Sequence, residues 1–472
     1  MLGPLAATAR AESLDAQGPP PWRVAGRVGF TVDAVAFPDS AGNPLLDVYL
    51  RVPPATVTAL ARDTLSDAAR LRVTVRLSGG FGAKPTEQTT EFALASGDSA
   101  GGFGRVVGLR MPVRPGPQKL RVRVEDVLAK KRGIIYTGRS VTESSTIQGP
   151  LTLAVPRRDA DVSDLEFVWA EGAPGAGRAF QRGGATVIPN PERLYGLFAT
   201  GLRARFTARA VAPVAWSWKA RVVDHDGHVV AEQDSSAPAT AMLDDALGFD
   251  VSAIPAGGYD LVLDLKPGAG AALQRRAHFS IAWHPESWLR NPGEVEDDVH
   301  FLLKPDEEDA FALMGPGEQE AYLEAFWAAR DPSPGTAVNE ARVTFLKRVD
   351  YANRTWTHAG LVKGMFSDMG RAYIRYGEPT EIVHQVIPTG DDALDGVLAE
   401  LRATEDRPLG DVDQKGPGGD QRPFELWIYD GQIGLPPDAD PKVTDRVRHR
   451  RLVFLFVDEH GLGDFRLRYS TE

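Results

Sequence analysis

The sequence predicts a multidomain protein, with two tandem all-β sandwiches followed by an α+β C-terminal domain. Apolar and polar residues alternate through much of residues 23–284, a spacing of three and four replaces this alternation after Pro285, and strand-like runs return near the C-terminus. The length of 472 residues fits about three domains. The contents of 43% apolar and 25% charged residues are typical of a globular chain.

The first domain is predicted over residues 23–153. Its runs LRVTVRL and KLRVRVEDV place Val73, Val75 and Val122 on one face, which is the pattern of a strand with one buried and one wet side. Turn residues such as Gly79-Gly80 separate the runs. Seven short strands at this spacing favour a β-sandwich; they are Arg27–Phe37, Leu45–Pro53, Arg70–Leu77, Thr86–Ala95, Arg105–Pro112, Gln118–Asp126 and Ile134–Thr142.

A second sandwich is predicted over residues 157–284. Asp226-Gly227 is a strong hairpin signal between two alternating runs. The entry PAGGY into the strand YDLVLDL resembles the late strands of immunoglobulin-like domains, so the expected fold is two tandem immunoglobulin-like sandwiches. Trp216 and Trp218 lie on one side of a strand, where they serve either as core residues or as an aromatic sugar-binding platform. Core packing is the favoured role.

Residues 285–472 are predicted to form helices and then a mostly antiparallel sheet. Thr336 is the expected N-cap of the helix that carries the apolar stripe Val338, Ala341, Phe345, Val349 and Ala352. Residues 388–423 are acidic, rich in Gly and Pro, and predicted to be a flexible insertion. The runs at 424–430, 451–458 and 464–470 are the predicted closing strands.

Charge and cysteine content exclude several classes of function. The net charge is −11, and residues 286–472 hold 21 basic against 36 acidic residues, while residues 1–150 carry a net charge of +6 without a clustered basic face. A surface that binds nucleic acid is therefore not expected. The sequence contains no run of about 18 apolar residues, so no membrane-spanning helix is expected. With no cysteine, the chain has no disulfide, thiolate metal site or cysteine nucleophile.

The N-terminal residues 1–22 allow two interpretations. Leu2–Ala9 is small and apolar, and Ala9-Arg10-Ala11 has the form of a signal cleavage site, which is consistent with the end of an export signal whose start lies upstream. The alternative is a flexible N-terminus.

The last two-thirds of the chain contain a specific combination of short elements. They are FWAARDPSPGTAVNE (326–340), RVDYAN (348–353), DMGR (368–371) with YGEP (376–379), ELWIYD (425–430), VFLFVDEHGLGDFRL (453–467) and VIPNPERLYG (187–196). In these elements the chain resembles the GWxTD-domain family of bacterial exported or envelope-associated proteins. The naming motif is degenerate, because Met365 stands where the family has Trp and Ser367 where it has Thr. Many relatives are lipid-anchored through an N-terminal cysteine, which this chain lacks.

The charged and amide residues of these elements support two hypotheses. They form either a ligand pocket, with carboxylates for acid/base chemistry or a divalent cation and arginines for an anion, or a polar network that joins helices to the sheet. The sequence favours the network, because no nucleophile or metal-ligand spacing accompanies it. The candidate residues are Arg330, Asp331, Asn339, Glu340, Arg348, Asn353, Asp368 and Arg371.

Other motifs give no catalytic or metal prediction. Asp224–His228 resembles the start of a calcium loop, but its twelfth position is Ser235 rather than Glu, so a hairpin turn is expected. The sequence contains neither HExxH nor GxSxG, and the glycine-rich run near Gly80 lacks P-loop spacing. We therefore expect no catalytic residues, no metal and no cofactor.

The expected function is that of a non-enzymatic binding or scaffold protein of the bacterial envelope with protein partners. Its expected location is periplasmic or extracellular if an upstream signal sequence exists. The alternative is an envelope hydrolase, acting on glycan or peptide, that uses the carboxylates of the C-terminal domain.

Overall fold

The computed structural model describes most of the chain in two compact units. The described residues are 13–16, 18–24, 26–39, 42–62, 68–79, 84–95, 98, 104–127, 143–171, 180–182, 185–197, 199–284, 292–336, 338–357, 362–386, 422–430 and 451–472. One unit comprises Met1–Val295 with Leu313–Ala321, and the other Glu296–Ala312 with Tyr322–Glu472. The two are described separately below.

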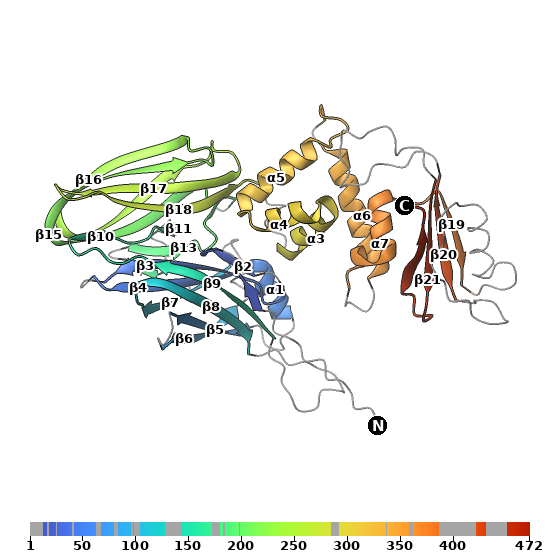
Figure 1. The fold of residues 1–472 in the computed structure, drawn as a ribbon, viewed down its shortest axis with the longest axis horizontal. Helices are drawn as coiled ribbons and strands as arrows, with labels where there is room; N and C mark the ends of the chain where they lie inside the picture. The colour runs from blue at the N-terminus through green and yellow to red at the C-terminus, as the bar shows by residue number, and fades with distance from the viewer. Residues whose placement is uncertain are drawn as a thin grey trace, which may run out of the picture. The chain divides into compact units, whose positions relative to one another are not determined.

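The first unit begins with a sandwich of two sheets (Figure 1). One sheet has the order β1-β9-β8-β5-β6, with β1 at Ser13–Asp15, β9 at Glu143–Leu153, β8 at Gly116–Asp126, β5 at Ala68–Ser78 and β6 at Thr86–Ala95. The other has the order β2-β3-β4-β7, with β2 at Trp22–Val24, β3 at Phe30–Pro38, β4 at Pro44–Val52 and β7 at Arg105–Pro112. A short helix, α1 (Pro54–Arg62), follows β4.

The core of this sandwich follows from the alternation in its strands. Val73 and Val122 from one sheet and Val48 and Leu50 from the other are fully buried in a single cluster. The predicted strands over residues 27–126 are therefore confirmed to within a few residues, whereas the predicted strand Ile134–Thr142 lies outside the described residues. The helix α1 was not predicted, because its sequence PATVTALAR is short and contains the β-branched residues that favour strands.

The second sandwich is built from one nine-stranded sheet with the path β12-β13-β11-β15-β17-β18-β14. Strands β10 and β16 also pair with β15. The bounds are β10 Ala160–Val162, β11 Glu166–Glu171, β12 Phe180–Arg182, β13 Ala185–Pro189, β14 Leu194–Gly196, β15 Gly201–Val223, β16 Val229–Asp250, β17 Gly257–Pro267 and β18 Leu273–Ala282.

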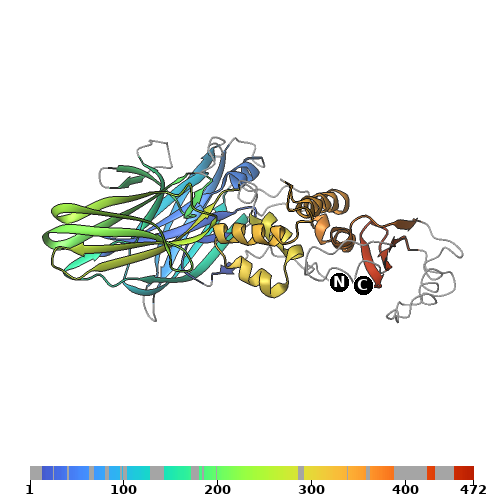
Figure 2. The same cartoon turned by 90° about the horizontal axis from the view of Figure 1, so that it is seen from above.

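The long hairpin β15–β16 runs through both layers of the sandwich and connects them in a single sheet. The first half of β15 pairs with β10 and β11 and the second half pairs with β17, while β16 pairs along the whole length. The register is interrupted between Arg209 and Trp216, where the two halves meet. Phe206 from the first half and Trp218 from the second are in one core cluster, so the sheet folds over onto itself (Figure 2). Trp216 and Trp218 are both core residues, as the sequence favoured.

The second unit contains helices and a four-stranded antiparallel sheet. The helices are α3 (Pro292–Leu302) and α5 (Pro316–Ala328), which cross the division between the units, and α4 (Pro305–Ala312), α6 (Glu340–Trp356), the 3₁₀ turn η2 (Gly364–Phe366) and α7 (Asp368–Tyr376). The sheet has the order β19-β20-β21-β22, with β19 at Glu381–Gln385, β20 at Phe424–Tyr429, β21 at Leu452–Asp458 and β22 at Phe465–Ser470. Most of the predicted insertion 388–423 lies outside the described residues.

Helix α7 covers one face of this sheet. Met369 and Tyr376 of α7 are clustered with Trp427 of β20 and with Phe454 and Phe456 of β21. The intervening residues of β21, including Leu455, belong to a second cluster on the opposite face. The strand is therefore buried on both sides, which explains its continuous apolar sequence LVFLFV. No described helix is long and apolar enough to cross a membrane.

Candidate functional site

The segment 364–368, with the sequence GMFSD, lies at the junction between α6 and α7. A Cβ atom at Gly364 would lie 2.0 Å from the Ala352 carbonyl oxygen, so only glycine allows this close approach. Ser367 is the N-cap of α7: its hydroxyl accepts from the Gly370 N–H at 3.0 Å and donates to the Gly364 carbonyl at 2.7 Å. The Ser367 hydroxyl thus both caps α7 and ties it to the turn before it.

Asp368 connects the same junction to the sheet. It lies in the first turn of α7, where a carboxylate is favoured by the helix dipole. Its Oδ2 accepts from the backbone N–H of Leu467 in β22 at 2.8 Å. Met365 is 1% exposed and accepts from Asn353 Nδ2 through its sulfur at 3.6 Å. Asn353 Oδ1 in turn accepts from the Met365 N–H at 3.0 Å.

The N-terminus of α6 begins at Glu340, with Asn339 as its N-cap. Asn339 Oδ1 accepts from the Arg342 N–H at 2.9 Å, and its Nδ2 donates to the Trp327 carbonyl of α5 at 2.7 Å. The prediction that Thr336 caps this helix is wrong, because the Asn339 side chain reaches the helix N–H groups. The Thr336 hydroxyl instead contacts Glu340 Oε1 at 3.1 Å, and Val338, predicted to be buried, is 53% exposed.

Arg330 and Asp331 stabilise the end of α5 and the loop after it. The Arg330 guanidinium lies 3.5 Å from the Phe326 ring centroid and donates to the Phe326 carbonyl at 3.2 Å. Asp331 Oδ1 accepts from the Ser333 N–H at 2.9 Å.

Arg348 is a cation at the C-terminus of α7. Its Nη1 donates to the Ile374 carbonyl at 3.1 Å and to the Arg375 carbonyl at 3.4 Å. A helix C-terminus carries unpaired carbonyls and partial negative charge, so the arginine is stabilised there. Arg371, on the outer side of the same helix, is exposed.

The eight predicted site residues therefore lie along several junctions of the second unit. The hydrogen bonds of Asn339, Arg348 and Asp368 lead to backbone groups of three different segments. The three predicted carboxylates also contact separate partners: Asp331 the loop at Ser333, Glu340 the hydroxyl of Thr336, and Asp368 the strand β22.

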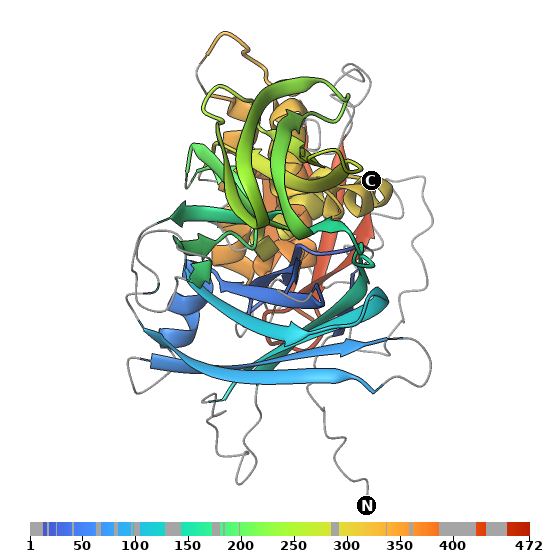
Figure 3. The same ribbon diagram turned by 90° about the vertical axis from the view of Figure 1, so that its left-hand side faces the viewer.

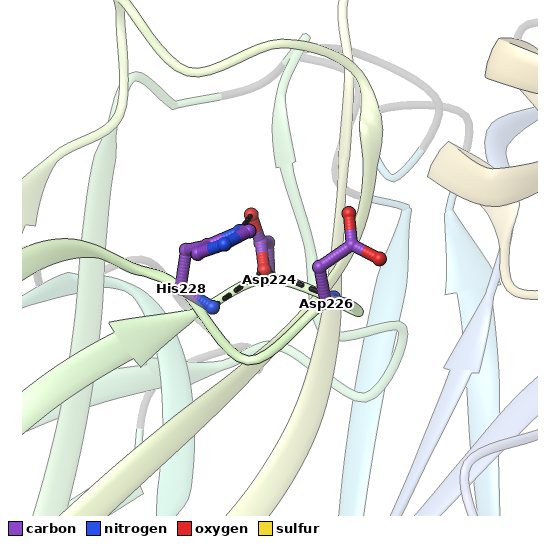
Figure 4. Close-up of side chains that lie close together, drawn as sticks. All are labelled: Asp224, Asp226 and His228. Atoms are coloured by element: carbon purple, nitrogen blue, oxygen red, sulfur yellow. Dashed lines mark hydrogen bonds and ion pairs between the residues drawn. The ribbon is translucent and has the colours of Figure 1, made fainter.

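The Asp224–His228 segment is the turn between β15 and β16, as predicted (Figure 4). Asp224 Oδ1 accepts from the N–H groups of Asp226 at 3.0 Å and His228 at 2.8 Å. These hydrogen bonds, that of the His228 N–H first, lower the pKa of Asp224. Candidate ligand atoms of Asp224, Asp226 and His228 lie within 4.8 Å of one another. Since the Asp224 carboxylate already caps the turn, the geometry is that of a hairpin.

Charged residues are buried between the two sandwiches of the first unit, a feature that the sequence did not suggest. Glu192 and Arg193 of the VIPNPERLYG segment, which the sequence singled out only by resemblance, both reach the first sandwich. Arg193 donates to both oxygens of Asp33 at 2.8 and 2.7 Å, and Arg51 forms an ion pair with Glu192. Asp33 is 2% exposed.

A second group of charges surrounds Glu166 in the same interface (Figure 3 shows the first sandwich in blue and cyan and the second in green). Glu166 of β11 is fully buried and lies 2.5 Å from the Tyr49 hydroxyl of β4. Asp47 of β4 accepts from Arg110 of β7 in two bonds of 2.7 Å. Arg205 of β15 donates to Asp244 of β16 at 2.9 Å.

The strand β4 contained a signal for this interface. Its sequence LLDVYLRV alternates, with Asp47, Tyr49 and Arg51 on the face opposite the apolar core. All three are less than 5% exposed, because the second sandwich covers that face. A strand face with a tyrosine between two charged residues can be exposed to solvent or buried in a polar interface. The alternation alone does not distinguish these two environments.

Comparisons with known proteins give no function. No protein-family model and no curated protein matches the chain. Solved structures similar to part of it include a red sea bream transglutaminase, at 8% identity over 54% of this chain and 31% of that one, with a TM-score of 0.16. A tetra-tandem repeat in the extending region of a large adhesion protein is similar at 13% identity, over 54% of this chain and 50% of that one, again with a TM-score of 0.16. The chain thus spans half or less of these structures, and the likeness is too weak to carry an argument.

Proposed function

We propose that the protein is a non-catalytic binding or scaffold protein that acts through protein–protein contacts outside the cytoplasm, and that it is a divergent relative of the GWxTD-domain family. The main support for the proposal is that the polar candidate residues form hydrogen bonds to backbone groups. Asn339, Asn353 and Asp368 direct their side chains at backbone groups of neighbouring elements. Residues engaged in this way maintain a framework.

The arrangement of carboxylates also favours a scaffold over a hydrolase. Glycoside hydrolysis typically uses two carboxyl groups that flank the scissile bond. Asp331, Glu340 and Asp368 instead contact a loop, a threonine hydroxyl and a strand. Burial raises the pKa of Glu166 to about 8, but this carboxyl is fully buried at the contact with Tyr49 of the first sandwich.

We also infer that the two sandwiches are immunoglobulin-like modules. Each has two layers around one apolar core, and the buried Asp33–Arg193 ion pair links the two modules. Modules of this type commonly present loops and strand edges to partners. An envelope location is the remaining part of the proposal and is supported by the export-like segment Leu2–Ala11.

One experiment separates the scaffold from the hydrolase. The purified full chain and its Glu340→Ala variant are incubated with peptidoglycan and with unfolded peptide, and their melting temperatures are compared. We expect neither protein to release products, and the variant to melt within about 2 °C of the parent because Glu340 is exposed. Product release by the parent that disappears in an equally stable variant would contradict the proposal.

A second experiment tests partner binding and location. The natural gene, with its upstream codons and a C-terminal tag, is expressed in its own cell, followed by fractionation and by cross-linked capture on the full chain. We expect a periplasmic or extracellular fraction and an envelope protein that, once purified, binds the chain with a saturable isotherm in calorimetry. Cytoplasmic retention would contradict the location, and failure of every purified candidate to bind would contradict the binding role.

A further inference from the structure

The outer face of the sheet β1-β9-β8-β5-β6 gathers basic side chains from two neighbouring strands. This sheet is the layer of the first sandwich that lies away from the second sandwich (Figure 3). In β5 and β8 every second residue, such as Val75 and Val122, is buried in the core, so the residues between them lie on the opposite face. The cations on that face are Arg70, Arg72 and Arg76 of β5 and Lys119, Arg121 and Arg123 of β8.

The pairing of β5 with β8 brings three of these cations close together. Arg76 lies directly opposite Arg121, and Ser78 lies opposite Lys119. The Cβ atoms of directly opposite residues are about 5 Å apart, and neighbours on one face of a strand are roughly 7 Å apart. Arg76, Arg121 and Lys119 thus form a basic triangle. No basic cluster was apparent in the sequence, because these cations alternate with core residues and come from two separate strands.

Carboxylates neutralise the cations at the other end of the same face. Arg72 donates from Nε to Glu91 of β6 at 2.8 Å, and its Nη2 lies 2.7 Å from the same oxygen. Arg123 Nη2 lies 2.7 Å from Glu125. These two arginines therefore have close partners within the sheet.

The basic triangle is only loosely compensated. Arg76 lies 3.9 Å from Glu87 and Lys119 lies 3.8 Å from Asp15, in pairs whose side chains are at least 49% exposed. Arg121 is exposed and forms an ion pair with no described residue. Exposed pairs of this kind contribute little to stability, and like charges directly opposite each other destabilise a sheet. The juxtaposition of Arg76 and Arg121 is therefore unfavourable unless an anion lies between them.

We propose that the basic triangle of Arg76, Arg121 and Lys119 is a binding site for an acidic polysaccharide. The two guanidinium groups bind sugar carboxylates, since the planar fork of arginine matches the geometry of a carboxylate. The Lys119 ammonium adds a further positive charge along β8. On the same face, Thr74 and Thr89 are exposed to each other's hydroxyls at 3.1 Å and retain acceptor capacity for sugar hydroxyls.

The side chains around the basic triangle favour a sugar polymer over other polyanions. Single-stranded nucleic acid is typically held by aromatic side chains that stack on its bases. Helices that bind membrane surfaces insert large apolar side chains beside their cations. The described residues of β5, β6 and β8 on this face include neither aromatic nor long aliphatic side chains. The site goes beyond protein–protein contact and does not depend on it.

Titration calorimetry of the full chain with polygalacturonate, a polymer of carboxylated sugars, tests the class of ligand. We expect saturable binding at about 50 mM salt that weakens at least about tenfold at about 500 mM salt, because counterions screen exposed charges. Neutral dextran should not bind. Absence of binding to polygalacturonate would overturn the proposal. Tighter binding to phosphatidylglycerol vesicles or to single-stranded DNA at equal charge concentration would overturn the assignment to a polysaccharide.

Single substitutions test the location of the site. Arg121→Gln and Arg76→Gln each remove one half of the like-charge pair, so the affinity for polygalacturonate should fall about tenfold. The melting temperature of Arg121→Gln should stay the same or rise, because a repulsion is relieved. Arg203→Gln, at an exposed arginine of β15 in the second sandwich, is the matched control and should change the affinity less than about twofold.

Two results would overturn this location. Equal affinities of Arg121→Gln and Arg203→Gln would mean that the polymer responds only to the net charge of the protein. A clearly lower melting temperature of Arg121→Gln would mean that the arginine stabilises the sheet rather than binding a ligand.

Discussion

Single glycines in the second unit determine how closely its segments approach. A Cβ atom at Gly370 would lie 2.0 Å from the Gly364 carbonyl oxygen, and one at Gly364 would lie 2.0 Å from the Ala352 carbonyl oxygen. The two glycines therefore allow α6, η2 and α7 to pack with their backbones in contact. A side chain at Gly364 or Gly370 would push these three segments apart.

Gly370→Ala is expected to destabilise the protein, although alanine favours a helix more than glycine does. The backbone would have to shift to accommodate the methyl group, at a cost of about 1–3 kcal/mol. Urea unfolding followed by tryptophan fluorescence measures the change. Gly335→Ala is the control, because a Cβ atom there meets nothing within 4 Å. Equal midpoints for the two variants would show that the close approach is not required.

Several of the polar candidate residues cap the ends of helices in the second unit. Asn339 caps α6, Ser367 caps α7, and Arg348 binds the last carbonyls of α7. Each supplies a partner to backbone groups that a helix leaves unpaired. A chain with short helices, such as the nine-residue α7, depends on these caps because its helices have few internal hydrogen bonds.

Asn339→Ala is predicted to be more harmful than Thr336→Ala. Asn339 satisfies both the Arg342 N–H and the Trp327 carbonyl, and the loss of such a cap costs about 1–2 kcal/mol. The exposed Thr336 should cost about 0.5 kcal/mol or less. Thermal unfolding by calorimetry ranks the two, and a larger effect at Thr336 would restore it as the functional cap.

The elements themselves could largely be predicted from the sequence. Strands β6 and β7 have the bounds that the alternation indicated, because each presents one face to a core and the other outward. The start of α6 was placed too early, since Thr336 and Asn339 are both good capping residues and only the contact with Trp327 distinguishes them. The candidate residues of the second unit were predicted only as a group, and their individual hydrogen-bond partners could not be predicted from the sequence.

At the scale of the whole molecule, the distinctive feature is a polar interface inside the first unit. The two sandwiches meet through charged strand faces that would otherwise be solvated. Removing one partner of a buried ion pair such as Asp33–Arg193 would leave the other charge buried without compensation, which is strongly destabilising.

A double-mutant cycle tests this interface. We expect Asp33→Ala and Arg193→Ala to show a coupling energy of about 2 kcal/mol or more, because both groups are buried and bonded at two atoms. The exposed pair Arg72–Glu91 should couple by less than about 1 kcal/mol. Denaturant unfolding of the full chain provides the free energies. Similar coupling in the two pairs would mean that the interface is open to water.

The sequence by itself determined the order of the architecture: strands with one apolar face through residue 284, then helices, then closing strands. Alternation and helical spacing are local properties, so they are readable without the fold. Only the tertiary structure decided what covers the second face of those strands. In β4 the alternation marks Asp47, Tyr49 and Arg51 as one polar face, and the fold places Tyr49 against Glu166 and Arg51 against Glu192 of the second sandwich. Period-two alternation specifies that a face is polar, but whether that face meets solvent or a complementary set of charges depends on residues more than a hundred positions away.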